Sequence, residues 1–324
     1  MLRQKPELNT IYISERMRHS LQPVARSSLT AVVAPMGYGK TTAINWYLNE
    51  RGREGAAVLR VSIYSANRAI FWKSLQKAFA QAGLTVLEGY RELTRAREYG
   101  MEIVEVFFAP EHFLGQNEFP LLETFASEGV KVCQVAPFLL EKMAYRERPE
   151  GLIAIAKMKR HTLAEMPVRP NGLYLVAEAV EKPGNLGSML RSADAAGVDG
   201  FIICNKCTDI YNPNVIRAST GALFSVPLAE AENQEAYDWL KRNNIKTLAA
   251  TPHTDRIYTD ADMTQAVAIV VGTEQTGLTE LWMEHSDLPV RIPMLGKIDS
   301  LNVATATTIL LYEAARQRNW KTSF

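Results

Sequence analysis

The second half of the chain alternates short apolar runs with stretches of helical periodicity. Four apolar runs have the length and near-continuous hydrophobicity of strands buried on both faces, namely LYLVAEAV, GFIIC, IKTLAAT and AVAIVVG at 173–180, 200–204, 245–251 and 266–272. Helical patterns lie between them, near 185–197, 212–224 and 236–244. Such alternation predicts an α/β domain with a parallel sheet over 170–324, and sheets of this kind bind ligands at the carboxyl ends of their strands.

A second, smaller α/β pattern precedes this domain. Residues 85–113 have the pattern of strand, helix and strand, and 124–158 continue the alternation. The stretch HTLAEMPVRPNG at 161–172 contains two prolines and a glycine, which is typical of a linker. We therefore expect three segments, which are 1–84, 85–165 and 170–324.

Charge divides the chain unevenly. Residues 1–84 hold 12 Lys and Arg against 4 Asp and Glu, whereas the remainder holds 24 against 31, which indicates two segments of different origin. The N-terminus lacks the apolar core of a signal peptide, and no apolar run has the length of a membrane span. The three cysteines Cys133, Cys204 and Cys207 suit a reducing compartment, and a single C-x-x-C without a second pair predicts no metal site. We expect a cytoplasmic protein without a membrane partner.

The first segment contains a motif that is close to a phosphate-binding loop. An apolar run leads into APMGYGKTT, in which backbone N–H groups near Gly37 and Gly39 would cradle phosphates, Lys40 would reach their oxygens and Thr41 would hold Mg²⁺. This segment resembles the start of the ATPase domain of LuxR/MalT-type regulators. The next apolar run, VLRVSIY, ends without the Asp that positions Mg²⁺ and water, so ATP is not an expected partner and a fused, partial P-loop segment is the preferred interpretation.

Another stretch of special residues lies near the C-terminus. Ile292 to Met294 has the pattern of a short strand, Pro293 and Gly296 shape a loop, and Ser300 opens an apolar helix. Backbone groups of such a loop can enclose a small ligand, although a capped helix after a plain turn has the same pattern. A Rossmann dinucleotide site is the rival interpretation, but the first turn, EKPGNLGSML, lacks G-x-G-x-x-G.

Three motifs in this order carry a resemblance to a known family. NLGSMLRSA at 185–193, GTEQTGL at 272–278 and IPMLGKIDSLNVA at 292–304 resemble the three motifs of the SpoU (TrmH) family of RNA ribose methyltransferases. The resemblance implies a trefoil-knotted (SPOUT) α/β domain, a homodimer, and S-adenosylmethionine as the cofactor. It implies catalytic roles for Asn185, Arg191, Glu274, Ser300 and Asn302, with Glu274 in a supporting role. The cofactor-binding positions that it implies are Gly272, Ile292, Leu301, Thr251, Met294 and Gly277.

The middle segment resembles the small substrate-binding domain that precedes the catalytic domain in many SpoU enzymes. Its basic residues would contact RNA phosphates or form a solvated face, and both interpretations stay open for Lys131, Lys142, Arg146, Arg148, Lys157, Lys159 and Arg160. Arg217 and Ser219 also follow the family pattern, which implies a place near the RNA or near the cofactor entrance. We expect methyl transfer to a ribose 2′-hydroxyl of RNA, with ribosomal RNA as the partner. Transfer RNA is the alternative substrate, and a regulatory protein that binds nucleotide through the P-loop is the alternative from another class.

Overall fold

The computed structural model of the protein describes residues 14–22, 40–54, 68–273 and 277–320. The chain forms two compact units, Met1–Ala82 and Gly83–Phe324. Among the described residues, no helix combines the length and the apolar character that crossing a membrane requires. The boundaries expected near residue 84 and between 165 and 170 stay predictions.

The first unit contributes three described helices, which are α1 (Glu15–Leu21), α2 (Lys40–Arg53) and α3 (Arg68–Gln81). Ser14 caps α1, since its hydroxyl accepts a hydrogen bond from the Met17 N–H at 3.3 Å. The helix expected after the P-loop-like motif is confirmed, and it begins at Lys40 with Thr41 in its first turn. Gly37 and Gly39 lie outside the described residues, so the nucleotide-binding loop stays a prediction.

The second unit opens with a small α/β domain. Its elements are β1 (Leu84–Glu88), α4 (Tyr90–Glu98), β2 (Ile103–Phe108), η2 (Pro110–His112), α5 (Glu118–Ser127), β3 (Lys131–Gln134), α6 (Pro137–Met143) and β4 (Leu152–Lys157). The sheet order is β1-β4-β2-β3, in which β4 runs antiparallel to both of its neighbours and β2 runs parallel to β3. The strand, helix and strand expected over 85–113 are thus confirmed.

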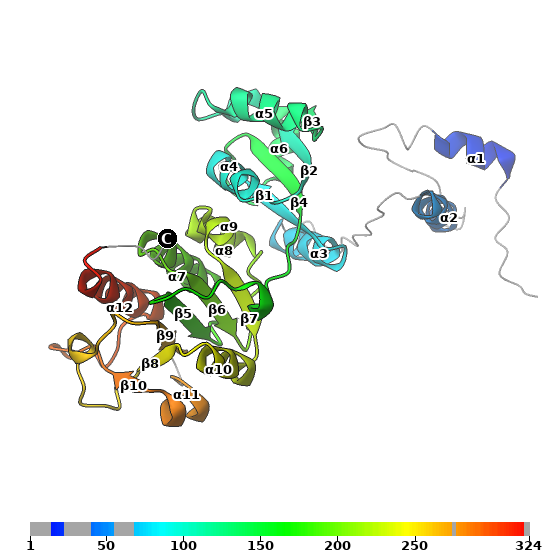
Figure 1. The fold of residues 1–324 in the computed structure, drawn as a ribbon. Coiled ribbons are helices and arrows are strands. Elements are labelled where there is room, and N and C mark those ends of the chain that lie inside the picture. Colours follow the sequence, from blue (N-terminus) through cyan, green and yellow to red (C-terminus); the bar gives the residue numbers. More distant parts are fainter. Residues whose placement is uncertain (1–13, 23–39, 55–67, 274–276, 321–324) are drawn as a thin grey trace, which may run out of the picture. The chain divides into compact units, whose positions relative to one another are not determined.

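A larger α/β domain follows the short η3 (Leu163–Glu165). Its elements are β5 (Leu173–Glu178), α7 (Pro183–Ala195), β6 (Gly200–Cys204), α8 (Pro213–Ser219), α9 (Ala222–Ser225), β7 (Leu228–Ala231), α10 (Asn233–Arg242), β8 (Lys246–Ala250), η4 (Tyr258–Asp260), β9 (Val267–Val271), α11 (Glu280–His285), β10 (Leu288–Val290) and α12 (Val303–Gln317). All six strands run parallel, in the order β10-β8-β9-β5-β6-β7 (Figure 1).

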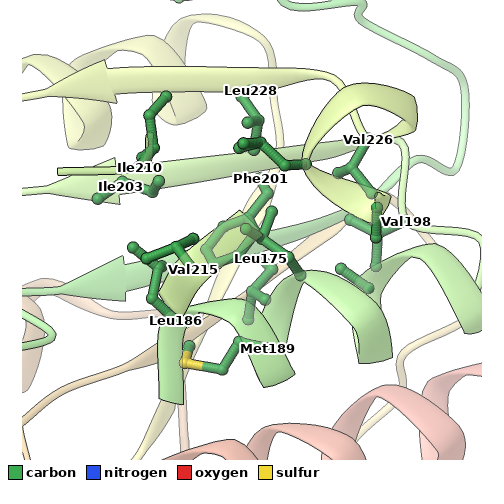
Figure 2. Packing of buried hydrophobic residues seen from close by; sticks show 14 of the residues in the cluster. Leu175, Leu186, Met189, Val198, Phe201, Ile203, Ile210, Val215, Val226 and Leu228 are labelled. Carbon is green, nitrogen blue, oxygen red and sulfur yellow. The ribbon is translucent and has the colours of Figure 1, made fainter. Parts of the chain in front are cut away.

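Both faces of this sheet are buried. Leu175 and Phe201 point to the face covered by α7 and α8, where they meet Leu186, Met189 and Val215 (Figure 2). The neighbouring positions along the strands point to the other face, which α10 and α11 cover with Trp239 and Trp282. Because a strand turns successive side chains to opposite faces, a sheet covered on both sides requires continuous apolar runs. Each buried Leu contributes roughly 1.5 to 3 kcal/mol.

The sequence pattern predicted the four inner strands, missed β7 and placed a fifth strand just after the position of β10. β7 and β10 form the opposite edges of the sheet. The strand expected at Ile292 to Met294 is wrong, because β10 ends at Val290 and a loop follows. Pro293 explains the shift, since proline has no N–H for the ladder. Of the two cysteines in the C-x-x-C, Cys204 is fully buried in the core whereas Cys207 is exposed.

Candidate active site

Three neighbouring strands of the larger sheet end at one edge. Thr251 follows β8, Gly272 follows β9, and Ile292 lies two residues after β10. Since the three strands are parallel and adjacent, their carboxyl ends meet at the same edge of the sheet. This is where open α/β sheets bind their ligands.

A cavity of about 530 Å³ lies at this edge. All six residues predicted to bind the cofactor line it, together with Ser300. Its walls are mainly apolar side chains and backbone, with a few polar groups, as in most small-molecule sites. The lining residues that the sequence did not single out include Pro252, His253, Val271, Leu278, Met283, Val290 and Asp299.

Gly272 permits the backbone loop after β9, which lines this cavity, to turn back tightly. The Thr273 and Gly277 backbones exchange hydrogen bonds of 3.2 Å in both directions, which closes a tight loop. A Cβ atom at residue 272 would lie 2.3 Å from the Gly277 carbonyl oxygen and 2.7 Å from the Leu278 nitrogen. Only glycine leaves room for this approach. Glu274, inside the loop, lies outside the described residues.

The first and third motifs, at 185–193 and 292–304, meet beside the cavity. The Asn302 side-chain amide donates a hydrogen bond of 3.1 Å to the side-chain oxygen of Asn185, which is 117 positions away in the sequence. Asn302 also caps α12, because its Oδ1 accepts from the Ala304 N–H at 3.0 Å. The prediction that Ser300 opens this helix is therefore wrong. Ser300 lies in the loop before the cap and lines the cavity instead.

Arg191 lies on α7, two turns beyond Asn185, and its side chain is exposed. It is not among the residues that line the cavity. Ser192, the next residue, faces α12, where its hydroxyl lies 2.7 Å from that of Thr308. Arg191 and Asp194 form no ion pair in the part of the chain that the structure describes, and Asp194 accepts a hydrogen bond from the Ser225 hydroxyl.

Sequence reasoning missed a buried carboxylate that positions the cavity loops. Glu178, at the end of β5, is 1% exposed. It accepts hydrogen bonds from the Thr279 N–H at 2.9 Å, from the Thr279 hydroxyl at 2.8 Å and from the Asn233 side-chain amide. The Trp282 indole in turn donates to Asn233 at 3.2 Å. The sequence did contain a signal for this role, because Glu178 is an acidic residue at the end of an otherwise apolar strand.

Most basic residues predicted to contact RNA from the small domain already have partners. Lys131 pairs with Glu105 at 2.6 Å, Lys157 with Glu102 at 2.7 Å, and Arg146 with Glu92 at 2.7 Å and with Glu150. The Lys142 ammonium lies over the Phe138 ring, and Lys159 donates to the Tyr99 carbonyl. These contacts favour the solvated-face interpretation for Lys131 and Lys157, whereas Arg146, with its side chain only 14% exposed, belongs to a part-buried ion-pair network. Ser219 is fully buried, where its hydroxyl donates to the Ile216 carbonyl at 2.8 Å.

Fold and site together define an α/β protein with a small-molecule cavity at the strand ends and a small α/β domain before it. Residues 172–312 match the SpoU rRNA Methylase family, and 71–154 match an MRM3-like substrate binding domain. The second match begins within α3, upstream of residue 85.

Several relatives are similar over most of their length. A 23S rRNA (uridine(2479)-2′-O)-methyltransferase of Streptomyces viridochromogenes is 33% identical, over 83% of this chain and 96% of its own. The 23S rRNA (guanosine-2′-O-)-methyltransferase RlmB of Escherichia coli K12 is 32% identical, over 68% of this chain and 98% of its own. The structure of the SpoU methyltransferase AviRb from S. viridochromogenes, in complex with the cofactor AdoMet, matches with a TM-score of 0.68 at 32% identity, over 76% of this chain and 96% of its own.

The chain belongs to the SpoU family of RNA methyltransferases. The predicted fold class, a SPOUT methyltransferase domain preceded by a small α/β substrate-binding domain, is confirmed.

Proposed function

We propose that the protein transfers a methyl group from S-adenosylmethionine to a ribose 2′-hydroxyl of ribosomal RNA. One observation carries the proposal. The six residues predicted to bind the cofactor surround one cavity, and the Asn185–Asn302 contact lies beside it. The relatives that act on 23S ribosomal RNA favour this substrate over transfer RNA.

The cavity suits S-adenosylmethionine in shape and charge. Backbone groups near Gly272 and Gly277 can hydrogen-bond to polar groups of the adenosine, and the apolar side chains of Ile292 and Leu301 can pack against its flat adenine ring. Asp299 also lines the cavity, and its carboxylate complements a cationic ligand. When bound, the cofactor supplies an electrophilic methyl carbon to the attacking ribose oxygen.

The polar residues beside the cavity orient the ribose. Asn185 and Asn302 hold each other in place, and Ser300 presents a hydroxyl to the cavity. The cationic Arg191 guanidinium binds phosphate or ribose and stabilises negative charge that develops on the 2′-oxygen. We assign Glu274 the supporting role that its motif implies.

We also infer that the protein is a homodimer and acts in the cytoplasm, where ribosomal RNA is found. Large apolar side chains are exposed around the cavity loop and α12, with Leu295 98%, Ile298 62% and Tyr312 43% exposed. Such side chains, gathered near a ligand site, favour an interface with a second copy. Light scattering after gel filtration should give twice the chain mass, and a Leu295→Asp variant should shift toward monomer. A monomeric wild-type protein would contradict the inference.

Methyl transfer is tested with labelled S-adenosylmethionine and two RNA pools, unmodified 23S ribosomal RNA transcripts and transfer RNA transcripts. We expect label in ribosomal RNA, recovered as a 2′-O-methylnucleoside after digestion and mass spectrometry. Arg191→Ala should abolish transfer while cofactor binding, measured by calorimetry, is retained. Label on a base, or none in either RNA despite cofactor binding, would refute the proposal.

A substitution in the P-loop-like motif distinguishes the proposed methyltransferase from the alternative, a regulatory protein that binds nucleotide. A Lys40→Ala variant removes the cation on which that motif depends. Unchanged methyl transfer by this variant supports the fused-segment interpretation, whereas its loss would make nucleotide binding by the first segment part of the activity.

A further inference from the structure

We propose that Arg91 and Arg95, on helix α4 of the small domain, bind RNA phosphates together with Arg191 and Arg217 of the larger domain. One basic surface would then span both domains beside the active site. The proposal rests on the proposed function and deepens it, because it assigns the small domain direct contacts with nucleotides that flank the target ribose.

Arg95 reaches across to the larger domain. Its aliphatic stem covers Gly221, the residue before α9, and a Cβ atom built on Gly221 would lie 2.8 Å from Cγ and 3.0 Å from Cβ of Arg95. The guanidinium at the end of this stem therefore lies at the junction of α4 and α9. Arg91 is one helical turn earlier on the same face and is exposed.

Arg191 approaches α8 and α9 from α7. Gly187 contacts α8 so closely that an added Cβ would lie 2.5 Å from the Ala218 Cβ, and Asp194 accepts a hydrogen bond from Ser225 of α9. Arg191 lies four residues after Gly187 and three before Asp194, so it belongs to the same face of α7. Figure 1 shows α4, then α9 and α8, then α7 in succession, and all three neighbouring pairs are in contact.

The arrangement of the two domains is held by side chains next to this surface. The Asn214 amide, on α8, donates to the Tyr145 hydroxyl of the small domain at 2.9 Å. The Arg217 guanidinium donates to the same Asn214 side chain at 3.4 Å and is exposed. Arg217 therefore lies beside the connection between the domains.

Charge distinguishes these arginines from others nearby. Arg97, two residues beyond Arg95, forms two hydrogen bonds of 2.9 and 2.6 Å with Glu128. Within the described ranges, no carboxylate lies within ion-pair distance of Arg91, Arg95, Arg191 or Arg217. Glu98, one turn past Arg95, marks the end of the basic face of α4. These four arginines have no acidic partner within ion-pair distance in the described part of the chain, and an RNA backbone would supply negative charge to them.

The test compares Arg95→Met with Arg97→Met on the same helix. Methionine keeps an unbranched apolar side chain over Gly221 and removes only the charge. Binding of 23S ribosomal RNA transcripts is measured by filter binding over a series of salt concentrations, cofactor affinity by calorimetry, and folding by thermal unfolding.

We expect Arg95→Met to bind this RNA about tenfold more weakly at about 0.1 M salt. The slope of log affinity against log salt should become shallower by about 0.7 to 0.9, which corresponds to one lost phosphate contact. Arg97→Met should match the wild type, and Arg95→Lys should retain most of the affinity. Cofactor affinity and thermal unfolding should stay unchanged in all variants.

Two results would overturn the proposal. One is wild-type affinity and slope in Arg95→Met, which would leave the arginine a packing role alone. The other is an equal effect of Arg97→Met, which would indicate a general charge effect. The proposed function is judged separately by methyl transfer, so a wild-type protein that binds RNA through Arg95 without methylating it would refute the function and keep the surface.

Discussion

Substitution of Gly272 by Ala tests whether the loop after β9 forms the cofactor cavity. The added Cβ would lie 2.3 Å from the Gly277 oxygen, 2.5 Å from its carbonyl carbon and 2.7 Å from the Leu278 nitrogen. All three are backbone atoms, so no side-chain rotation relieves the clash. The loop must open, and the two Thr273–Gly277 hydrogen bonds of 3.2 Å break.

The cost follows from these contacts. Overpacking costs roughly 1 to 3 kcal/mol, and each lost backbone hydrogen bond about 1 kcal/mol. The open loop relieves this strain in the free protein but must close again to bind the cofactor. We therefore expect cofactor affinity to fall by about 2 to 4 kcal/mol, which is roughly thirtyfold or more in Kd. The free energy of unfolding should fall by less, about 1 to 2 kcal/mol, because the strand itself stays paired.

Calorimetric titration with S-adenosylmethionine measures the affinity, and urea unfolding measures the stability. Gly296→Ala is the matched control, because nothing lies within 4 Å of the added atom although Gly296 belongs to a loop whose residues Met294 and Asp299 line the same cavity. That variant should bind as the wild type does. Wild-type affinity in Gly272→Ala would refute the assignment of this loop to the cofactor site.

Three further predictions concern stability. Arg318→Ala should lower the free energy of unfolding by about 2 to 4 kcal/mol in urea, because Arg318 donates at 2.8 and 2.7 Å to the Met263 and Gln265 carbonyls and secures the end of α12; an unchanged midpoint would contradict this. Glu178→Gln should cost about 2 to 3 kcal/mol and weaken cofactor binding, since an amide turns a donor toward groups that already donate; equal stability would exclude this role. Burial lowers the pKa of His161 below 6.5, so the neutral imidazole stabilises the fold fully above that pH, and this stabilisation declines as the pH falls through the lowered pKa. The variant His161→Phe cannot be protonated, so its free energy of unfolding should fall less than that of the wild type between about pH 7 and about pH 5.

Much of the larger domain could be predicted from local pattern. The four inner strands are buried on both faces, so each is a continuous apolar run that the sequence displays directly. The edge strands β7 and β10 carry little of that signal. The segment of β10 has three residues with a proline in the middle, and that of β7 is only partly buried. An edge strand is identified by the neighbour it pairs with, which local sequence does not specify.

The cofactor positions were predicted from motifs that resemble those of the family, and these motifs lie in loops at strand ends. Thr251, Gly272 and Ile292 each follow a strand, and a parallel sheet brings such positions together whatever their distance along the chain. Their roles stay predictions. The reason that Gly272 must be glycine was not visible, because the clash involves a backbone that folds back from Gly277.

The sequence by itself determined the class of fold, the family and the segments that carry the site, because periodic burial and motif residues are local properties. Only the tertiary structure decided which residues meet. Glu178 binds Asn233 and Thr279, which are 55 and 101 positions away, and Asn185 meets Asn302 across 117. It also separated the basic residues that form ion pairs, such as Arg97 and Lys131, from those that lack an acidic partner among the described residues. These contacts depend on long-range packing. The local periodicity of the sequence shows which face of a helix or strand a side chain occupies, but it does not show which distant residue the side chain contacts.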